Sequence, residues 1–583
     1  MYTDDRNAQI VLSLLKQYCI KKIVISPGTT NVPITISVQT DPFFEVYSVV
    51  DERSAAYFAT GLAFESGEPV VISCTGATAS RNYLSALTEA YYRNLPIIAL
   101  TSQHSPNDPG NFSPQYTNRT ISQADVKRIS VDLPFVHSKD KEEACILAVN
   151  KALTMATTKG GGPVHINLHM TSLHFATSKL PDILRIYFYQ TEDLFSEDIV
   201  EELSVQLSSK KVAVLIGSHR KFTPKETEAI AKFANTYDTV VYCDHTSNYH
   251  GQYKVLTSVA SNLKQVNIKP DIVIDIGGIT GDYSAPDLFS GADFWRISED
   301  GVYHQRCGNL RKQFDCSENT FFTVLAKENP KVSSHSFYNM IIENIGDVTV
   351  PDLPLSNTFI SQQIAEKLPN GCSLHLGILN SLRNMDFFQL DETIDCSCNV
   401  GGFGIDGAVS TLIGQSMANR GRLYFGQIGD LAFFYDMNAL GIRHIGNNVR
   451  ILLVNNGRGV EFRLNPTLNT PLGEQLDQFV TAGGHFGSAK AWAQSMGFEY
   501  LTASSKNDFL LYIDTFCTPD LDAYDKPVLF EVYTTVEDEQ EGLRLIREAN
   551  RPIGSVLQNK AKDMAKKVIP RKMINKINKL KTK

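Results

Sequence analysis

Two short segments of the chain carry oxygen-bearing side chains at a spacing that suits a bound metal ion. Gly429-Asp430-Leu431 and Asn455-Asn456-Gly457 place Asp430 and Asn456 26 residues apart, with a helix-like stretch and an apolar strand-like run between them. Mg²⁺ is usually held by one or two carboxylates together with other oxygen atoms and phosphate groups. We therefore predict that Asp430, the amide oxygen of Asn456 and the backbone carbonyl of Arg458 bind Mg²⁺, and we call these three groups the metal clamp.

The position of the metal clamp and its glycines favour a diphosphate as a further ligand. The apolar run 451–454 ends directly before Asn455, and open α/β sheets bind ligands at the carboxyl ends of their strands. Gly429 and Gly457 would let the backbone approach a diphosphate closely. Gly-Asp and Asn-Asn are also common in turns, so two ordinary loops are the alternative interpretation.

A third segment, far upstream, contains a candidate acid. Asp51-Glu52-Arg53-Ser54 follows a β-like run that ends at Val50 and opens the helical pattern of residues 55–67. A carboxyl group that is held protonated in a dry pocket has a raised pKa, because burial disfavours the charged form. The alternative is that Glu52 only occupies a helix N-terminus, where the helix dipole favours acidic residues.

Together these segments resemble the thiamine-diphosphate enzymes, and most of all the synthase family of menaquinone biosynthesis. The likeness covers both catalytic halves of the chain and is weak in the middle third. It runs through residues 26–35, 49–63, 73–102, 161–170, 398–414, 429–441 and 451–462. The resemblance implies thiamine diphosphate and Mg²⁺ as cofactors. It also implies that a 2-oxo acid is decarboxylated and that the resulting enamine is transferred to an acceptor, as in a carboligase.

The resemblance assigns roles to individual residues. Glu52 would hydrogen-bond the aminopyrimidine of the cofactor, and Ile405 would hold the cofactor in its bent shape. Gln115 would face the reaction intermediate, and Ser381 would lie close to the bound acid. The expected catalytic residues are Glu52, His104, Gln115 and Glu461.

The remaining expected contacts are with cofactor and substrate. The expected cofactor contacts are Glu52, Thr75, Ile405, Gly429, Asp430, Leu431, Asn456, Arg458, Gly459 and Val460. The expected substrate contacts are Ser26, Thr30, Ser381 and Arg383. The resemblance further implies a homodimer or homotetramer in which Glu52 of one subunit faces the metal clamp of another.

Several arginines of the family are replaced in this chain. Thr30, His104, Met385 and Val400 stand where the family has arginines. Arginine binds carboxylates through paired, charge-assisted hydrogen bonds. The replacements therefore predict altered recognition of acidic substrates.

New charged or titratable residues occur in the same segments. Glu461 either protonates the reacting carbon, as a glutamate does in thiamine-dependent decarboxylases, or forms an ion pair with Arg458 or Arg463, and we favour the ion pair. His104 is either a general acid or base, because its reference pKa lies near neutrality, or a surface residue that only forms hydrogen bonds.

Apolar β-like runs alternate with helical patterns along the whole chain, which predicts an α/β protein with parallel sheets covered by helices. We expect three doubly wound parallel-sheet domains: a pyrimidine-binding domain (1–183), a central domain (190–347) and a diphosphate-binding domain (354–550). The central domain lacks a full GxGxxG fingerprint. Its glycines at 217 and at 277–278 are therefore interpreted as tight turns, with a nucleotide site as the alternative.

Composition narrows the class of protein. The chain has 583 residues, a net charge of −8 with mixed signs and ten scattered cysteines. This charge argues against a nucleic-acid binder, and the cysteine pattern predicts buried thiols in a reducing, cytoplasmic setting. No signal peptide or apolar run long enough to span a membrane is expected. The basic tail, 551–583, either is solvated or touches an anionic membrane surface or an acidic partner.

Three functions are compatible with these patterns. The favoured one is a carboligase that takes a 2-oxo acid donor and an acceptor. The alternatives are a simple 2-oxo acid decarboxylase that releases an aldehyde, similar to phosphonopyruvate decarboxylase, and a catalytically silent scaffold of the same fold.

Overall fold

The structure of the protein, a computed structural model, describes residues 1–103, 115–118, 121–158, 160–170, 173–183, 185, 197–281, 285–300, 304, 306, 310–328, 333–465, 468–469, 472–482, 484–485 and 487–552.

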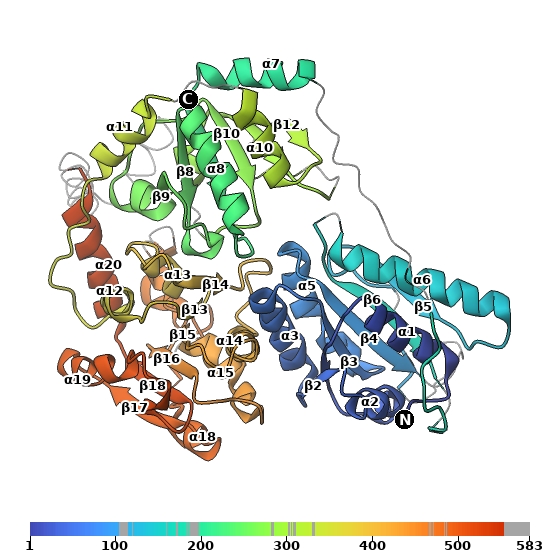
Figure 1. The fold of residues 1–583 in the computed structure, drawn as a ribbon. Helices are drawn as coiled ribbons and strands as arrows, with labels where there is room; N and C mark the ends of the chain where they lie inside the picture. The colour runs from blue at the N-terminus through green and yellow to red at the C-terminus, as the bar shows by residue number, and fades with distance from the viewer. Residues whose placement is uncertain are drawn as a thin grey trace.

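Three parallel sheets of six strands each form the frame of the molecule, with helices on both faces (Figure 1). The first contains β1 (Lys22–Ile25), β2 (Glu45–Ser48), β3 (Val70–Thr75), β4 (Ile97–Gln103), β5 (Ile129–Leu133) and β6 (Val164–His169). The central sheet contains β7 (Val212–Ile216), β8 (Thr239–Cys243), β9 (Lys254–Leu256), β10 (Ile272–Ile276), β11 (Asp293–Ile297) and β12 (Leu310–Phe314). The third contains β13 (Ser373–Leu376), β14 (Asp395–Cys398), β15 (Tyr424–Gly429), β16 (Val449–Asn455), β17 (Glu499–Ala503) and β18 (Val528–Tyr533).

The helices follow the strands in alternation. Those of the first part are α1 (Arg6–Gln17), α2 (Val32–Gln39), α3 (Glu52–Ser66), α4 (Thr78–Asn82), α5 (Leu84–Tyr92) and α6 (Lys139–Thr157). Those of the central part are α7 (Glu197–Ser208), α8 (Pro224–Thr236), α9 (Ala285–Leu288), α10 (Glu318–Glu328) and α11 (Ser336–Ile345). Those of the third part are α12 (Asn357–Lys367), α13 (Asn380–Met385), α14 (Ala408–Ser416), α15 (Asp430–Tyr435), α16 (Glu461–Leu464), α18 (Lys490–Ser495), α19 (Lys506–Phe516) and α20 (Val536–Asn550).

The predicted fold class, three parallel-sheet α/β units, is confirmed. Every pairing between neighbouring strands is parallel. Strands such as β7 and β16 are buried along their whole length, because helices cover both faces of a parallel sheet. The residue limits predicted for the three domains stay a prediction.

The first and third sheets have the same topology. If the strands of each sheet are numbered from its own first strand, both read 2-1-3-4-6-5. The central sheet reads 6-5-4-1-2-3, which in the opposite direction is the Rossmann order 3-2-1-4-5-6. The internal similarity of the first and third units was not visible in the periodicity of the sequence.

Equivalent helices of the first and third units pack against each other, and Figure 1 shows α3 and α14 at the boundary between the two sheets. A Cβ atom on Gly61 would lie 2.0 Å from the Thr411 carbonyl oxygen, and one on Gly414 would lie 2.0 Å from that of Phe58. Only glycine permits this approach. One apolar core is therefore shared by the two units.

In the central unit, the two glycine turns pack on one another. The Gly217 N–H donates to the Ile276 carbonyl at 3.0 Å, and the Gly278 N–H donates to the Ser218 carbonyl at 2.7 Å. A Cβ atom on Gly217 would lie 1.8 Å from the Gly278 carbonyl oxygen. The close contact between the two turns thus explains why glycine occupies these positions.

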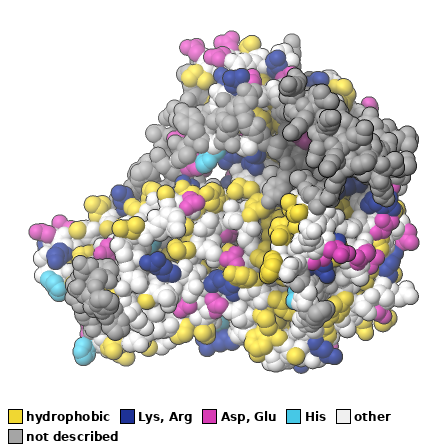
Figure 2. All heavy atoms as spheres, turned by 180° about the vertical axis from the view of Figure 1, so that it is seen from behind, with side chains coloured by type: hydrophobic (Ala, Val, Ile, Leu, Met, Phe, Trp, Pro, Cys, Tyr) yellow, Lys and Arg dark blue, Asp and Glu magenta, His cyan; other side chains and the backbone are white. Residues whose placement is uncertain are grey.

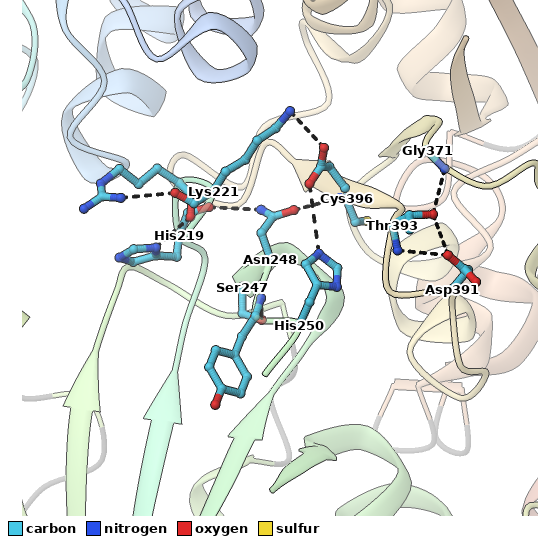
Figure 3. A network of polar contacts seen from close by, with 12 residues as sticks. His219, Lys221, Ser247, Asn248, His250, Gly371, Asp391, Thr393 and Cys396 are labelled. Carbon is cyan, nitrogen blue, oxygen red and sulfur yellow. Dashed lines mark hydrogen bonds and ion pairs between the residues drawn. The ribbon is translucent and has the colours of Figure 1, made fainter. Parts of the chain in front are cut away.

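A polar network joins the central unit to the third sheet (Figure 3). The Cys396 N–H at β14 donates to the Asn248 side-chain oxygen at 2.8 Å. Lys221 Nζ lies 2.8 Å from Asp395 and 2.7 Å from Glu65, which belongs to α3. This cluster, Glu65, Lys221, Asp395 and Arg422, contacts all three units and is called the three-sheet junction below.

On the face opposite to that of Figure 1, basic and acidic side chains are interspersed with groups of hydrophobic ones (Figure 2). No helix in the described part of the chain is long and apolar enough to cross a membrane. The nine described cysteines are free thiols, and all except Cys19 are buried. The tail from residue 553 onward lies outside the described residues.

Candidate active site

The metal clamp lies at the carboxyl ends of two neighbouring strands. β15 ends at Gly429 and is followed at once by α15, which begins at Asp430. β16 pairs with β15 in parallel, so that Gly429 lies opposite Val454, and it ends at Asn455. The parallel register therefore brings Asp430 and the turn after Asn455 to the same edge of the sheet.

The Asp430 carboxylate organises the turn that follows β16. Its Oδ2 atom accepts hydrogen bonds from the backbone N–H groups of Asn456 (3.1 Å), Gly457 (2.7 Å) and Arg458 (3.2 Å). Its Oδ1 atom accepts from the Leu431 N–H at 2.7 Å. Gly457 has φ +74°, a conformation that favours glycine. Burial raises the pKa of Asp430, an effect that these hydrogen bonds oppose only in part.

The amide oxygen of Asn456 is buried and has no hydrogen-bond partner among the residues that the structure describes. A buried polar atom without a partner is costly, and it suits a ligand that the protein has yet to bind. The Arg458 carbonyl accepts one hydrogen bond, from Val460 N–H at 3.0 Å, which leaves oxygen lone-pair capacity for a cation. The described residues contain no group of three His, Cys, Asp or Glu side chains that could hold a metal, so a cation here would depend on amide and carbonyl oxygens. The donor set fits Mg²⁺.

His485 is a neighbour of Asp430 that the sequence analysis missed. Its Nε2 atom lies 3.1 Å from Asp430 Oδ2, and its ring contacts Phe434 edge-on. His485 is flanked by glycines in the segment GGHFG, which is the only signal that could have drawn attention to it. A cation bound to Asp430 would compete with this imidazole for the same carboxylate oxygen.

The start of α3, which contains Glu52, contacts the end of α15 that lies away from Asp430. It is the first residue of α3, and the preceding Asp51 caps this helix by accepting from Arg53 N–H (2.9 Å) and Ser54 N–H (3.2 Å). Arg53 Nη2 donates to the carbonyl of Tyr435, the last residue of α15, at 3.0 Å. Because α15 rises about 1.5 Å per residue, this contact lies about 8 Å along the helix axis from Asp430.

Asp436 is a second residue that sequence reasoning did not identify. It is fully buried directly after α15 and accepts from Ser410 N–H (2.7 Å), Ser410 Oγ (2.7 Å) and Ser54 Oγ (3.4 Å). Burial raises its pKa to about 7. Asp436 thereby links the start of α3, the start of α14 and the end of α15.

The predicted contacts of the first unit form a polar group at the carboxyl edge of its sheet. Thr30 Oγ1 is hydrogen-bonded to Thr75 Oγ1. Ser102 Oγ donates to the Thr30 carbonyl at 2.7 Å, and Ser26 Oγ donates to the Val49 carbonyl at 2.9 Å. The structure thus brings Thr30 and Thr75 together. The hydroxyl groups of Ser26 and Thr30 are engaged within the protein.

The ion pair predicted for Glu461 is wrong in its partner. Glu461 Oε1 lies 2.5 Å from Arg383 Nη1, while Arg458 and Arg463 converge on Asp477 at 2.7 and 2.6 Å. Glu461 opens α16 and faces α13, whereas the two arginines face the segment that contains Asp477. The ion pair itself was expected, but its geometry could not be read from sequence neighbours.

Two of the four positions at which the resemblance led us to expect a family arginine are core positions in this chain. Met385 and Val400 are fully buried in the apolar core of the third unit. Ser381 is buried on α13 near its start. No cationic side chain at these positions is available to bind a carboxylate.

Ile405 is half-buried against the core shared by the first and third units. The turn before it is held by Glu89 of α5, whose Oε2 atom accepts from Gly402 N–H at 2.5 Å. Burial raises the pKa of Glu89.

Gln115 is exposed with φ +60°, and His104 lies outside the described residues.

Comparisons with known proteins identify relatives of the chain. Residues 6–126 match the family described as thiamine pyrophosphate enzyme, N-terminal TPP binding domain. The 2-succinyl-5-enolpyruvyl-6-hydroxy-3-cyclohexene-1-carboxylate synthase of Bacteroides fragilis is 31% identical over 561 residues, which cover 92% of this chain and 97% of that protein. The synthase of the same name from Phocaeicola vulgatus is 29% identical over 570 residues, which cover 94% and 98%.

Solved structures share the fold at lower identity. Benzoylformate decarboxylase from Polynucleobacter necessarius superposes with a TM-score of 0.70 at 17% identity and covers 92% of this chain and 99% of its own. The thiamine diphosphate-dependent 4-hydroxybenzoylformate decarboxylase of Rhodococcus jostii RHA1 gives a TM-score of 0.67 at 16% identity and covers 91% and 99%. These two likenesses support the fold alone.

The family expected from the motifs is confirmed, and with it the expectation of a thiamine-diphosphate-dependent enzyme that decarboxylates a 2-oxo acid and transfers the remaining fragment. The chain belongs to the 2-succinyl-5-enolpyruvyl-6-hydroxy-3-cyclohexene-1-carboxylate synthase family of thiamine-diphosphate-dependent enzymes.

Proposed function

We propose that this enzyme uses Mg²⁺ as well as thiamine diphosphate, and that Glu52 and the metal clamp are the two ends of its cofactor site. The observation that carries the proposal is the buried, unpartnered amide oxygen of Asn456 beside Asp430. A further support is that the start of α3, which contains Glu52, contacts the other end of the helix that begins at Asp430. An isolated turn has no need to bury a polar oxygen without a partner.

In this proposal each group has a separate task. Asp430, Asn456 and the Arg458 carbonyl would hold the cation at the diphosphate end of the cofactor. Gly429, Leu431, Gly459, Val460 and Thr75 border the cofactor, and Ile405 supports it from the shared core. The bound cofactor supplies a nucleophilic carbon and an electron sink for decarboxylation. Glu52 would form a hydrogen bond with the cofactor's pyrimidine ring and so hold a proton at that ring.

We propose that the product of this enzyme carries fewer carboxylates than the tricarboxylic product in the relatives' name. Thr30 is neutral and engaged with Thr75, and Met385 and Val400 are apolar core residues. Arg383 is the cation of α13 near Ser381, and its Nη1 atom is paired with Glu461. A substrate carboxylate would compete with Glu461 for Arg383. Gln115 and His104 stay candidates on the loop that follows β4.

The most direct test is product analysis by mass spectrometry with a panel of 2-oxo acids, each supplied with and without an acceptor such as an aldehyde or an activated alkene. A carboligase forms a coupled product only when the acceptor is present. Monocarboxylic donors should be preferred over dicarboxylic ones. Free aldehyde in equal amount with and without acceptors would instead establish a simple decarboxylase.

We also propose that the active enzyme is a homodimer or a dimer of dimers, located in the cytoplasm. Large apolar side chains near both ends of the site are exposed in the single chain: Val50 (73%), Tyr435 (56%) and Phe479 (83%). Such residues suit burial by a second copy. The free, mostly buried thiols suit a reducing compartment.

Mixing two inactive variants tests whether the site is shared between subunits. Glu52→Gln and Asp430→Asn should each lose activity by about 10²-fold or more. Hybrids formed by unfolding and refolding them together contain one site with both intact residues if Glu52 and Asp430 come from different chains. Activity would then recover to as much as a quarter of the wild-type value, by random pairing. No recovery in verified hybrids would show that each chain forms its own site.

A further inference from the structure

A cavity of about 360 Å³ lies on the first sheet and borders the region of Glu52, since the pKa of its lining residue Tyr83 is raised by burial and also by the Glu52 carboxylate. Thr101 of β4 and His165 of β6 contribute its floor, Leu84 and Leu87 of α5 contribute one wall, and residues 121–123 with 126–127 contribute another. Among the described residues, none of those proposed for the cofactor or substrate lines it. Its volume lies within the range of small-molecule sites.

The charged side chains that line the cavity are all cationic. They are Arg81 and Lys127, and the described lining residues include no aspartate or glutamate. Burial lowers the pKa of Lys127 to about 8, and desolvation is the cause. A half-buried ammonium group whose charge is disfavoured by burial gains stability when an anion approaches it.

The polar floor of the cavity is fixed by hydrogen bonds within the protein. His165 Nε2 is bonded to Thr101 Oγ1 and His165 Nδ1 to Ser130 Oγ, both at 2.8 Å. Because both ring nitrogens are occupied, His165 shapes the floor and contributes no free donor from its ring. The walls are largely apolar, with Leu84, Leu87 and Val126 facing the space. The cavity thus combines apolar walls with cations.

We propose that this cavity binds a small organic carboxylate with an apolar body, whose carboxylate group pairs with Lys127 and Arg81. The apolar body lies against the leucines of α5, and the anionic head lies toward the segment that carries Lys127. Arg81 Nη2 donates to the Asn118 carbonyl at 3.3 Å, a contact that holds its guanidinium at the rim. The ligand site is separate from the metal clamp and does not depend on the function proposed above.

Benzoate and benzamide are matched probes, because they share size and ring but differ in charge. Isothermal titration of the cofactor-loaded enzyme at pH 8 should show one benzoate per chain at this site and at least about tenfold weaker binding of benzamide. Lys127 is about half protonated at that pH. Benzoate binding should therefore take up as much as about half a proton per site, measured in buffers of different ionisation enthalpy.

Variants separate this site from the active site. Lys127→Gln should weaken benzoate binding at least about tenfold and abolish the proton uptake, and Arg81→Gln should weaken binding while the uptake persists. Lys139→Gln, at a position whose side chain is 88% exposed, is the matched control and should change neither quantity. Asp430→Asn should retain benzoate binding with its proton uptake.

Four outcomes would overturn the proposal. The first three are equal affinity for benzoate and benzamide, benzoate binding that Lys127→Gln leaves unchanged, and binding that disappears in Asp430→Asn. Absence of benzoate binding to the wild-type enzyme, including absence because a second copy covers the cavity, would overturn it as well.

Discussion

At the scale of single residues, two adjacent asparagines at the end of β16 differ in their hydrogen-bond partners. Asn455 Nδ2 donates to the Gly487 carbonyl (3.0 Å) and to the buried Glu531 carboxylate (2.7 Å), whereas the Asn456 amide oxygen has no partner in the described part of the chain. We predict that Asn456→Ala weakens Mg²⁺-dependent thiamine diphosphate binding by about 10–100-fold, measured by calorimetry. Its Tm without cofactor should stay close to that of the wild type, because no hydrogen bond of that oxygen is lost.

Asn455→Ala is the matched control for this prediction. It removes a donor from the fully buried Glu531 and should lower Tm, because a buried carboxylate loses a hydrogen bond. If Asn456→Ala destabilised the cofactor-free protein as much as Asn455→Ala does, or left Mg²⁺-dependent binding intact, Asn456 would be a structural residue.

At the scale of elements, Asp436 joins α3, α14 and α15 through a carboxyl group whose pKa is about 7. The folded pKa lies above the ordinary value, so the folded state binds a proton more tightly than the unfolded chain does. The free energy of unfolding should therefore fall as pH rises from about 4 to about 7. Asp436→Asn cannot titrate, and we predict that it reduces this slope by up to about 1.4 kcal/mol per pH unit, measured by urea denaturation at several pH values.

Glu539, whose pKa burial also raises to about 7, would keep part of the slope in that variant. The control is Asp352→Asn, since the Asp352 side chain is 95% exposed, and it should leave the slope unchanged. An identical slope in wild type and Asp436→Asn would show that Asp436 is ionised throughout this range.

At the scale of the whole molecule, the three-sheet junction connects all three units around one buried acid. The Glu65 side chain is 3% exposed and lies 2.7 Å from Lys221 and 2.6 Å from Arg422, both of which also contact Asp395. We predict that Glu65→Gln destabilises the fold by about 3 kcal/mol, because two cations are left with one carboxylate. A clear fall in Tm, with earlier proteolysis between the units, would be the measured result.

Glu228→Gln removes one partner of an exposed pair with Lys232 and serves as the control, since exposed ion pairs contribute little. If both variants lowered Tm equally, the junction would not hold the units together. The Asp395 pKa is lowered, although burial opposes this, by Lys221 and Arg422. Its contribution should be present above the unfolded pKa and be lost as pH falls through the folded one.

The chemistry of the site could be predicted where it depends on local order. A buried strand followed by Gly-Asp or Asn-Asn specifies a strand end, and parallel strands place their carboxyl ends at one edge of a sheet. The order of these segments along the chain is therefore enough to predict that Asp430 and Asn456 lie close together. Glu52 is similar, because the cap Asp51 and the following helical pattern fix it at the first turn of α3.

Contacts between distant segments were decided only by the tertiary structure. The pairing of Glu461 with Arg383 spans 78 residues, and the contact of His485 with Asp430 spans 55. Which cation meets which anion depends on how helices and loops from separate strands are oriented, and a side chain's sequence neighbours do not specify that orientation. The residue types and their order along the chain determined the cofactor chemistry, whereas the packing of α13, α16 and the segment around His485 determined which charges remain for a substrate.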